Sequence, residues 1–181
     1  DKNKLYVIFV DNLQFKKEHS KQKIIPQMIE TGYYCSRIKT PTLIISIFKT
    51  NYQIDCIVPI ISYDVEIYNI NTIYNKYKLN INALNNFTYI KITKSNIYKY
   101  YDYLVKSINN LFKFVLIVEI ENILNLINND MLYIYLIISN NNIICCYVFR
   151  NNYKNIVLCS SFNNVKTTDI FCDGFYIVLS N

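Results

Sequence analysis

The sequence predicts a mixed α+β fold, on three observations. The chain opens with an apolar run rich in β-branched residues, Leu5 to Val10, which is typical of a buried strand. Apolar side chains at i, i+4 and i+7 spacing in residues 97–111 indicate a helix. The stretch from Met131 to Phe162 is rich in Ile, Tyr and Val, which indicates consecutive strands. Strand–helix units followed by adjacent strands are the pattern of an α+β or mixed α/β fold.

The first half is expected to contain three strands and two helices. After the strand at Leu5–Val10 comes a polar and basic segment, residues 12–23. A helix is expected from Ile24 onward, and Pro26 is tolerated there because the first helical turn does not use its N–H. The other elements expected in this half are strands at Leu43–Phe48 and Ile54–Ile61 and a helix at Tyr68–Leu79.

The Asn-rich segment from Leu79 to Phe87 is the expected boundary between two domains, residues 1–82 and 83–181. A strand at Thr88–Ile92 and a helix follow, and Thr93 or Ser95 is expected to cap the helix. The apolar positions of this helix are Ile97, Tyr101, Leu104, Ile108 and Leu111. The elements expected after it are an extended run at Phe114–Val118, a helix at Ile120–Ile127, and strands at Met131–Ile138, Ile143–Phe149 and Ile156–Phe162.

The composition indicates which residues occupy the turns and whether any apolar stretch is long enough to span a membrane. The 181 residues include only 2 Gly, so we expect Asn at turn positions that need left-handed backbone. The most apolar stretch, Met131 to Phe149, is interrupted by Ser139 to Asn142. A bilayer-spanning helix needs about 20 apolar residues in one run. The stretch is therefore expected to form a hairpin, and no transmembrane segment is expected.

The six cysteines do not form a metal-binding pattern. None of them belongs to a C-x-x-C pair, and His19 is the only histidine, so no structural zinc or other metal site is expected. Free Cys usually packs as a small apolar residue. We expect this for all six, which are Cys35, Cys56, Cys145, Cys146, Cys159 and Cys172. Reduced thiols suit a cytoplasmic protein.

Motifs of side-chain catalysis are missing from the sequence. It contains no P-loop, no G-x-G-x-x-G, no G-x-S-x-G and no H-E-x-x-H. A catalytic triad would have to use His19, which has no neighbouring nucleophile. Glu119 and Glu121 are expected to face solvent. Classical side-chain catalysis is therefore not expected.

The segment that indicates a ligand is a strand, a basic loop and a helix in succession. Four lysines, Lys16, Lys17, Lys21 and Lys23, precede the helix expected at Ile24. A helix N-terminus presents unpaired N–H groups and a partial positive charge, which suit a phosphate group. The alternative interpretation is a solvated basic loop, because clusters of surface lysines are common.

Four segments carry a family resemblance. Residues 7–11 read V-I-F-V-D, residues 20–30 read S-K-Q-K-I-I-P-Q-M-I-E, residues 89–97 read Y-I-K-I-T-K-S-N-I, and residues 159–167 read C-S-S-F-N-N-V-K-T. In this order they resemble four motifs of the eukaryotic glycylpeptide N-tetradecanoyltransferases, the N-myristoyltransferases: F-L-C-V-H, R-S-K-R-x-x-P-x-L-I-x-E, L-R-P-M-x-x-x-D-I and Y-S-F-Y-N-V-x-T. The last match is the most specific. The resemblance covers the middle of the family's catalytic domain.

The resemblance implies a fold, an activity and a set of site residues. The family has two related acetyltransferase-like (GNAT) halves, of which this chain would hold the first half and the start of the second. It transfers myristate from myristoyl-CoA, the acyl donor, to the N-terminal glycine of substrate proteins, without a metal. The backbone N–H groups of Val7 and Ile8 would form its oxyanion hole, in which backbone donors tolerate changed side chains. The other implied roles are contacts with CoA for Ser20, Lys21, Lys23, Ile25 and Pro26, and contacts with the peptide side for Thr50, Ser161 and Asn164.

Some residues depart from the family pattern. Tyr6 stands where the family has Asn before the oxyanion residues, and Asp11 where it has His. His19 and Gln22 stand in place of phosphate-binding arginines. The family's general base is its C-terminal carboxylate, which has no counterpart at Asn181. The resemblance thus implies either a fragment or a protein that has lost catalysis.

The residues alone are compatible with two other functions. The net charge of +6 and the 18 Tyr allow a nucleic-acid-binding module, in which aromatic side chains stack on bases beside Lys. Tyr98, Tyr100, Tyr101 and Tyr103 surround one expected helix rather than forming a stripe, so no stable nucleic-acid partner is expected. A scaffold protein without a ligand is the third possibility.

Overall fold

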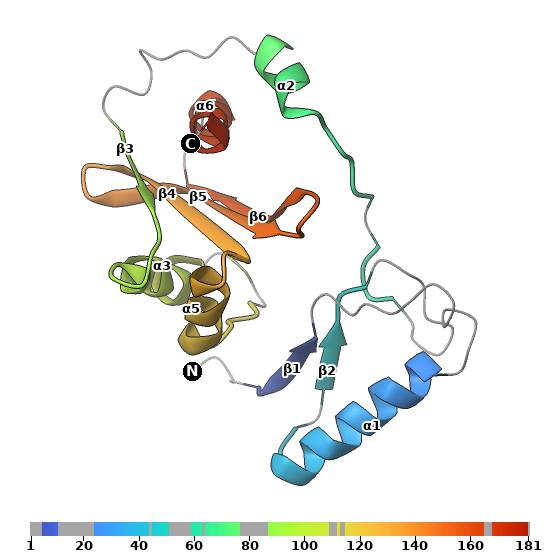
Figure 1. Cartoon of the computed structure of the whole chain (residues 1–181). Helices are drawn as coiled ribbons and strands as arrows, with labels where there is room; N and C mark the ends of the chain where they lie inside the picture. The colour runs from blue at the N-terminus through green and yellow to red at the C-terminus, as the bar shows by residue number, and fades with distance from the viewer. Residues whose placement is uncertain are drawn as a thin grey trace. The chain divides into compact units, whose positions relative to one another are not determined.

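The computed structural model is a mixed α+β protein, as the sequence predicts, and divides into two compact units, Asp1–Glu66 and Ile67–Asn181 (Figure 1). The sequence-based boundary at 82/83 falls in residues 77–86, which lie outside the described residues. The structure describes residues 5–10, 24–43, 45–50, 59–62, 64–76, 87–108, 112, 115–164 and 168–180.

The N-terminal unit contains a parallel β–α–β arrangement. Strand β1 (Val7–Val10) pairs in parallel with β2 (Ile45–Phe48), and helix α1 (Ile24–Lys39) lies between them in sequence. A parallel pair needs such a crossover connection, since a tight turn can join only antiparallel strands. The positions of both strands and of this helix are confirmed, with Pro26 in the first turn of α1, but β1 is half-buried to exposed and not the buried strand that its apolar run predicts.

The remaining elements predicted in the first half fall partly outside the described residues. Pro59 to Ile61, at the end of the strand predicted at Ile54–Ile61, have no strand conformation, so this part of the prediction is wrong. Pro59 has no N–H to give to a strand ladder. Residues 51–58 lie outside the described part of the chain. Helix α2 (Ile70–Lys76) confirms the helix predicted in this region.

The C-terminal unit is built on a four-stranded antiparallel sheet with the order β3-β4-β5-β6. Each of its strands was predicted within a few residues. Their bounds are Thr88–Lys91 for β3, Leu132–Ser139 for β4, Asn142–Asn151 for β5 and Ile156–Asn163 for β6. The helices of the unit besides α2 are α3 (Ile97–Tyr103), which continues as the π-helical η3 (Leu104–Ile108), α5 (Ile120–Asn128) and α6 (Thr168–Ser180).

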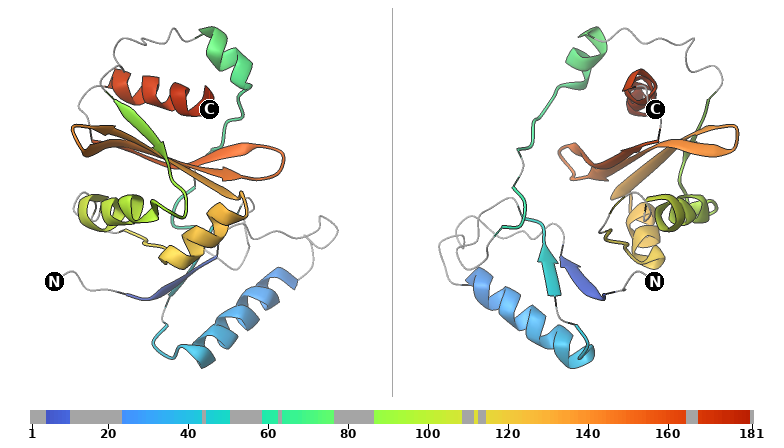
Figure 2. Two further views of the ribbon diagram at one scale, coloured as in Figure 1. Left: turned by 60° about the vertical axis from the view of Figure 1, so that its left-hand side comes forward. Right: turned by 180° about the vertical axis from the view of Figure 1, so that it is seen from behind.

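Helices cover both faces of this sheet, with α3 and α5 on one face and α6 on the other (Figures 1 and 2). Alternate residues of a strand point to opposite faces. On β4, Ile134 and Leu136 therefore join the core under α3 and α5, while Tyr135 and Ile137 join the core under α6. Because the two central strands are buried on both faces, they lack the alternation of a half-exposed strand and read as continuous apolar runs.

The cap of α3 differs from the prediction. The N-cap residue is Asn96, and neither Thr93 nor Ser95 caps the helix. Instead, the Asn96 side chain accepts a hydrogen bond from the Thr93 N–H at 2.6 Å and donates one to the Lys91 carbonyl at 3.0 Å. The side chain thus closes the turn that follows β3, which the spacing of capping residues alone did not indicate.

The turn between β4 and β5 confirms the expected use of asparagine. Asn140 has φ 48° and Asn141 has φ 62°, and the two together make the left-handed turn that suits a two-residue hairpin. Glu119 and Glu121 are exposed, as predicted. In the described part of the chain, no helix is long and apolar enough to cross a membrane.

Helix α6 was not predicted from the sequence, and its packing depends on a glycine. A Cβ atom at Gly174 would lie 2.7 Å from the Tyr147 hydroxyl oxygen and would also clash with Ile137. The Tyr147 hydroxyl donates a hydrogen bond to the Phe171 carbonyl of the same helix at 2.6 Å. Gly174 therefore lets α6 approach β4 and β5 closely.

Candidate functional site

The candidate site in the N-terminal unit lies around β1 and α1. The basic segment that connects them includes Ser20, Lys21 and Lys23, which lie outside the described residues. Of the residues implied to contact CoA, the structure describes Ile25, which is 7% exposed, and Pro26, which is half-buried. Both lie in the first turn of α1, and this turn contains no acidic residue. Within the described residues, the first turn of α1 therefore offers no carboxylate to offset the positive end of the helix dipole.

The backbone groups of Val7 and Ile8 point to opposite edges of strand β1. The Lys49 N–H donates to the Val10 carbonyl at 2.9 Å, so the backbone groups of Val10 face β2. Because these groups alternate along a strand, those of Ile8 also face β2, and those of Val7 point to the other edge. Within the described residues, the sheet of this unit has two strands, so the Val7 N–H lies on its unpaired edge. Two successive amides facing one oxyanion would require a β-bulge.

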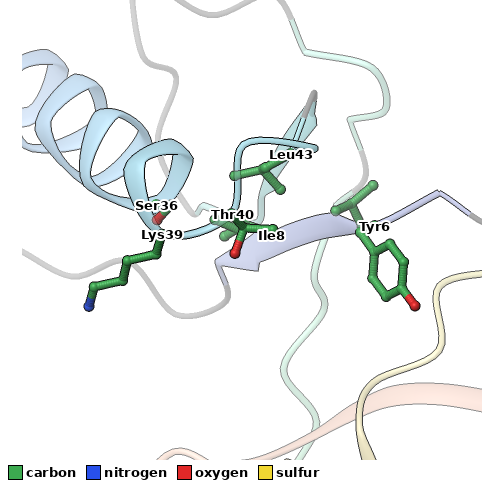
Figure 3. Close-up of a pocket in the computed structure, with 7 residues that line it drawn as sticks. Tyr6, Ile8, Ser36, Lys39, Thr40 and Leu43 are labelled. Atoms are coloured by element: carbon green, nitrogen blue, oxygen red, sulfur yellow. The ribbon is translucent and has the colours of Figure 1, made fainter.

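A shallow pocket of about 260 Å³ lies beside Val7 and Ile8. In Figure 3, Thr40, Ile8 and Leu43 are grouped at its centre, and Tyr6 and Lys39 lie at its opposite ends. The Ser36 hydroxyl, also in the lining, donates to the Gly32 carbonyl at 2.7 Å and is therefore used within α1. The volume is below the usual range of about 300–1,000 Å³ for small-molecule sites. The pocket can take only a small part of a large ligand.

The pocket and the N-terminus of α1 lie at opposite ends of the β–α–β unit. The pocket lining includes Ser36 and Lys39 from the last turn of α1, whereas Ile25 and Pro26 lie in its first turn. A helix of this length, 16 residues, spans about 24 Å. Any ligand that contacts both ends must be long and extended.

The residues implied to contact the peptide side occupy different surroundings. Thr50 follows β2, is half-buried and already has an interaction partner. Ser161 on β6 pairs with Tyr147, whose side chain lies under α6. Asn164 reaches Tyr103 of α3, on the opposite face of the sheet. The structure thus places Ser161 on the edge strand β6 and Asn164 directly after this strand, with their side chains on different faces of the sheet.

The side chain of Asn164 joins three segments of the C-terminal unit. Its Nδ2 donates to the Tyr103 hydroxyl at 2.9 Å and to the Ile143 carbonyl at 3.2 Å. Its backbone N–H donates to the Ile144 carbonyl at 2.8 Å. The sequence does not predict that Tyr103 contacts Asn164, because this contact links residues 61 positions apart and has no periodic signature.

The tyrosines of α3 do not form a stacking surface. Tyr100 and Tyr103 are 6% and 5% exposed and belong to the core, and Tyr101 packs against it. Tyr98 is 69% exposed. Among these four side chains, one is therefore available to stack on a base.

The thiols of β5 are unsuited to nucleophilic chemistry. Cys145 and Cys146 are fully buried. Burial raises the pKa of Cys145 to about 11, and burial followed by the neighbouring Cys145 raises the pKa of Cys146 further. The thiolate is the nucleophilic form of cysteine, so both groups are inert at neutral pH. Cys35 is exposed, so the prediction that it packs as a small apolar residue is wrong, because Ile25 is the residue of α1 that is buried.

No group of three or more His, Cys, Asp or Glu that could hold a metal ion occurs among the described residues. Comparison with known proteins gives no further identification. No protein-family model matches the chain, and no curated protein matches it.

Proposed function

We propose that this protein is an acyl-CoA-binding relative of the N-myristoyltransferases with a GNAT-like fold. It would bind myristoyl-CoA through its N-terminal unit and transfer myristate to a peptide with an N-terminal glycine. The observation that carries the proposal is the β1–α1–β2 unit, in which a connection with four lysines ends at the N-terminus of a 16-residue helix. The four sequence motifs of the family, in their order, specify the ligand.

The electrostatics of α1 favour a phosphate group at its start. The first N–H groups of a helix have no partner within the helix, and the helix dipole adds about half a positive charge there. The first turn of α1 itself contains no acidic residue that would offset this charge. Lys21 and Lys23 immediately precede the helix, so phosphates of CoA would meet both kinds of positive charge.

The separation of the two ends of the β–α–β unit suits an acyl-CoA. In this ligand, the pantetheine arm separates the phosphates from the thioester. With the phosphates at the start of α1, the thioester would lie along β1, where the Val7 N–H is on the strand edge that no other described strand pairs with. This amide can donate to the thioester carbonyl and stabilise the negative charge that develops during acyl transfer.

A strand followed by a helix occurs in both units, which supports the proposal of two related acetyltransferase-like halves. In the N-terminal unit, β1 is followed by α1. In the C-terminal unit, β6 is followed by α6, and a family motif again lies at this strand. A repeated strand–helix unit is what the family's two acetyltransferase-like halves imply.

Titration with a fluorescent myristoyl-CoA tests the binding step. The variant Lys21→Gln/Lys23→Gln should bind about tenfold more weakly, because each exposed lysine contact with a phosphate is worth roughly 0.5–1 kcal/mol. The matched control is Lys94→Gln/Lys99→Gln, which removes the same charge from exposed positions of the C-terminal unit. Absence of saturable binding by the unaltered chain would refute the proposal, as would equal weakening in the two variants.

Acyl transfer is tested separately with radiolabelled myristoyl-CoA and a peptide that begins with glycine. A peptide that begins with alanine is the control for acceptor specificity. Binding without transfer would identify an acyl-CoA-binding protein without the enzymatic step. A salt-dependent affinity for single-stranded oligonucleotides, together with no affinity for acyl-CoA, would favour the nucleic-acid-binding alternative instead.

A further inference from the structure

The outer face of helix α1 carries a stripe of exposed, mostly apolar side chains. Positions three or four residues apart lie on the same side of a helix. Five residues of α1 with this spacing are all exposed and are named the α1 stripe: Ile24, Met28, Thr31, Cys35 and Ile38. The exposed fractions of Ile24, Met28 and Ile38 are 37%, 55% and 64%. From its first to its last residue the stripe is about 21 Å long.

The opposite side of α1 makes the contacts within the N-terminal unit. The helix lies along one side of strands β1 and β2 (Figure 1). Ile25 is buried, and Ile29 and Ser36, which follow it on the same side of the helix, are half-buried. A surface helix normally has polar residues on the face away from its core. An apolar stripe on that face therefore indicates a surface that binds a partner.

The residues that border the stripe are aromatic or basic. Tyr34 lies beside it and is 67% exposed, and Lys39, at the end of the helix, is exposed as well. The last turn of α1 contains Arg37 and Lys39, and Glu30 is the single acidic residue in the sequence of this helix. Tyrosine is favoured at the headgroup level of a bilayer, and basic side chains attract anionic lipids. Apolar, aromatic and basic residues in this arrangement are typical of helices that lie in a membrane interface.

We infer that the α1 stripe is a docking surface for an anionic membrane. The helix would lie in the plane of the bilayer surface with the stripe towards the lipid. Its apolar side chains would enter the boundary between headgroups and acyl chains, and the Lys39 ammonium group would stay among the anionic headgroups. The inference does not rest on the proposed acyl-CoA binding. It uses side chains on the outer face of α1, whereas the CoA phosphates would meet the backbone N–H groups at the start of the helix.

The spacing of the stripe would also suit a partner helix, and two observations favour the membrane instead. The stripe covers about two heptads, whereas sustained coiled-coil pairing takes about three or four. A second copy of α1 would also bring like charges together, because Lys23 precedes the helix and Arg37 and Lys39 end it. An anionic surface has the opposite charge and needs no matching pattern of side chains.

Cosedimentation of the full chain with lipid vesicles tests the docking surface. The vesicles contain phosphatidylcholine and phosphatidylserine in equal parts, or phosphatidylcholine alone. The unaltered chain should bind the anionic vesicles, and more weakly as salt is added. Met28→Gln/Ile38→Gln should lower the partition coefficient about tenfold or more, because two apolar side chains no longer enter the lipid. Both positions are exposed, so these substitutions should not disturb folding.

Two matched controls separate the stripe from general properties of the surface. Ile156→Gln/Leu158→Gln alters two apolar side chains of strand β6 that are 55% and 42% exposed, and it should leave the partition coefficient unchanged. Lys39→Gln should weaken binding to the anionic vesicles about fivefold and leave binding to phosphatidylcholine unchanged. Lys99→Gln removes the same charge from an exposed position of α3 and should have a smaller effect.

A fluorescent reporter locates the contact, since the sequence contains no Trp. On addition of anionic vesicles, the emission of a Met28→Trp variant should shift to shorter wavelength and should be quenched by brominated lipids. Tyr98→Trp, at a position of α3 that is 69% exposed, should show neither change.

Lack of binding to anionic vesicles would overturn the inference, as would equal losses in the stripe variant and its β6 control, or quenching at both reporter positions. Self-association that Met28→Gln/Ile38→Gln abolishes, without vesicle binding, would overturn it in favour of a second copy of the chain. The binding of fluorescent myristoyl-CoA is measured on the same variants and should not change. A chain that binds vesicles but not myristoyl-CoA would refute the proposed function and support this inference.

Discussion

Replacing Gly174 by alanine tests the packing of α6 against the four-stranded sheet. The added methyl group would lie 2.7 Å from the Tyr147 hydroxyl oxygen and would overlap the end of the Ile137 side chain. Both neighbours are buried, at 0% and 2% exposure, so neither can move into solvent. Tyr147 is further held by its hydrogen bond to the Phe171 carbonyl and by ring contacts with Phe171 and Phe175, at centroid distances of 5.1 and 5.8 Å.

Three effects determine how much Gly174→Ala changes the free energy of unfolding. Overpacking of a filled core costs about 1–3 kcal/mol. Loss of the Tyr147 hydrogen bond adds about 1 kcal/mol. The higher helix propensity of alanine offsets about 1 kcal/mol of this destabilisation. We therefore expect Gly174→Ala to lower the free energy of unfolding by about 2 kcal/mol, which corresponds to a Tm lower by roughly 5–10 °C.

Gly32→Ala is the matched control, because the chain has two glycines and both lie inside helices. Apart from its chain neighbours and the backbone of its own helix, no atom of the described residues lies within 4 Å of the Cβ position at Gly32. In this variant only the higher helix propensity of alanine should act, and it should raise the free energy of unfolding by about 1 kcal/mol. Urea unfolding followed by far-UV circular dichroism measures both variants, and the two changes should have opposite signs.

Two results would contradict this account of the packing. One is a Gly174→Ala variant as stable as the unaltered chain. The other concerns Tyr147→Phe, which removes the oxygen that the new methyl group meets. Its cost should be smaller in the Gly174→Ala background than alone, because the two changes share one contact. Strictly additive costs would show that Tyr147 is not the neighbour that resists the alanine.

Three further outcomes are expected. Asn141→Gly should leave the stability unchanged or raise it, whereas Asn141→Val should lower it by about 1–2 kcal/mol because φ is 62° there; urea unfolding measures both, and equal stabilities would contradict the turn geometry. Stability should be constant from pH 7 to about 9 and fall towards pH 11, because the raised pKa values of Cys145 and Tyr103 mean that the folded state holds these protons more tightly. Unfolding curves across this range check it, and a stability that rises with pH would oppose it. A maleimide at pH 7 should label exposed Cys35 and spare buried Cys145 in the native protein; mass spectrometry of digests reads this out, and equal labelling would contradict the burial.

Much of the fold could be predicted from local patterns. The β-branched run at Leu5–Val10 predicts β1, the periodicity from Ile97 predicts α3, and the Asn-rich break at residues 139–142 predicts the β4–β5 turn. Each of these signals depends on the conformational preferences of neighbouring residues. The sequence does not predict helix α6, because its residues are apolar on several sides and form no single apolar stripe. The helix also contains Gly174, a residue that disfavours helix interiors but is needed here for the close approach to the sheet.

The α+β class, most strand positions and the basic segment before α1 follow from local patterns of residues. Three arrangements depend on the folded chain: the side chains of Ser161 and Asn164 lie on opposite faces of the sheet, the amides of Val7 and Ile8 point to different strand edges, and Tyr103 holds Asn164. The difference lies in the range of the interactions. Local preferences act between residues a few positions apart, whereas these arrangements arise from strand pairing and packing between segments far apart in the chain.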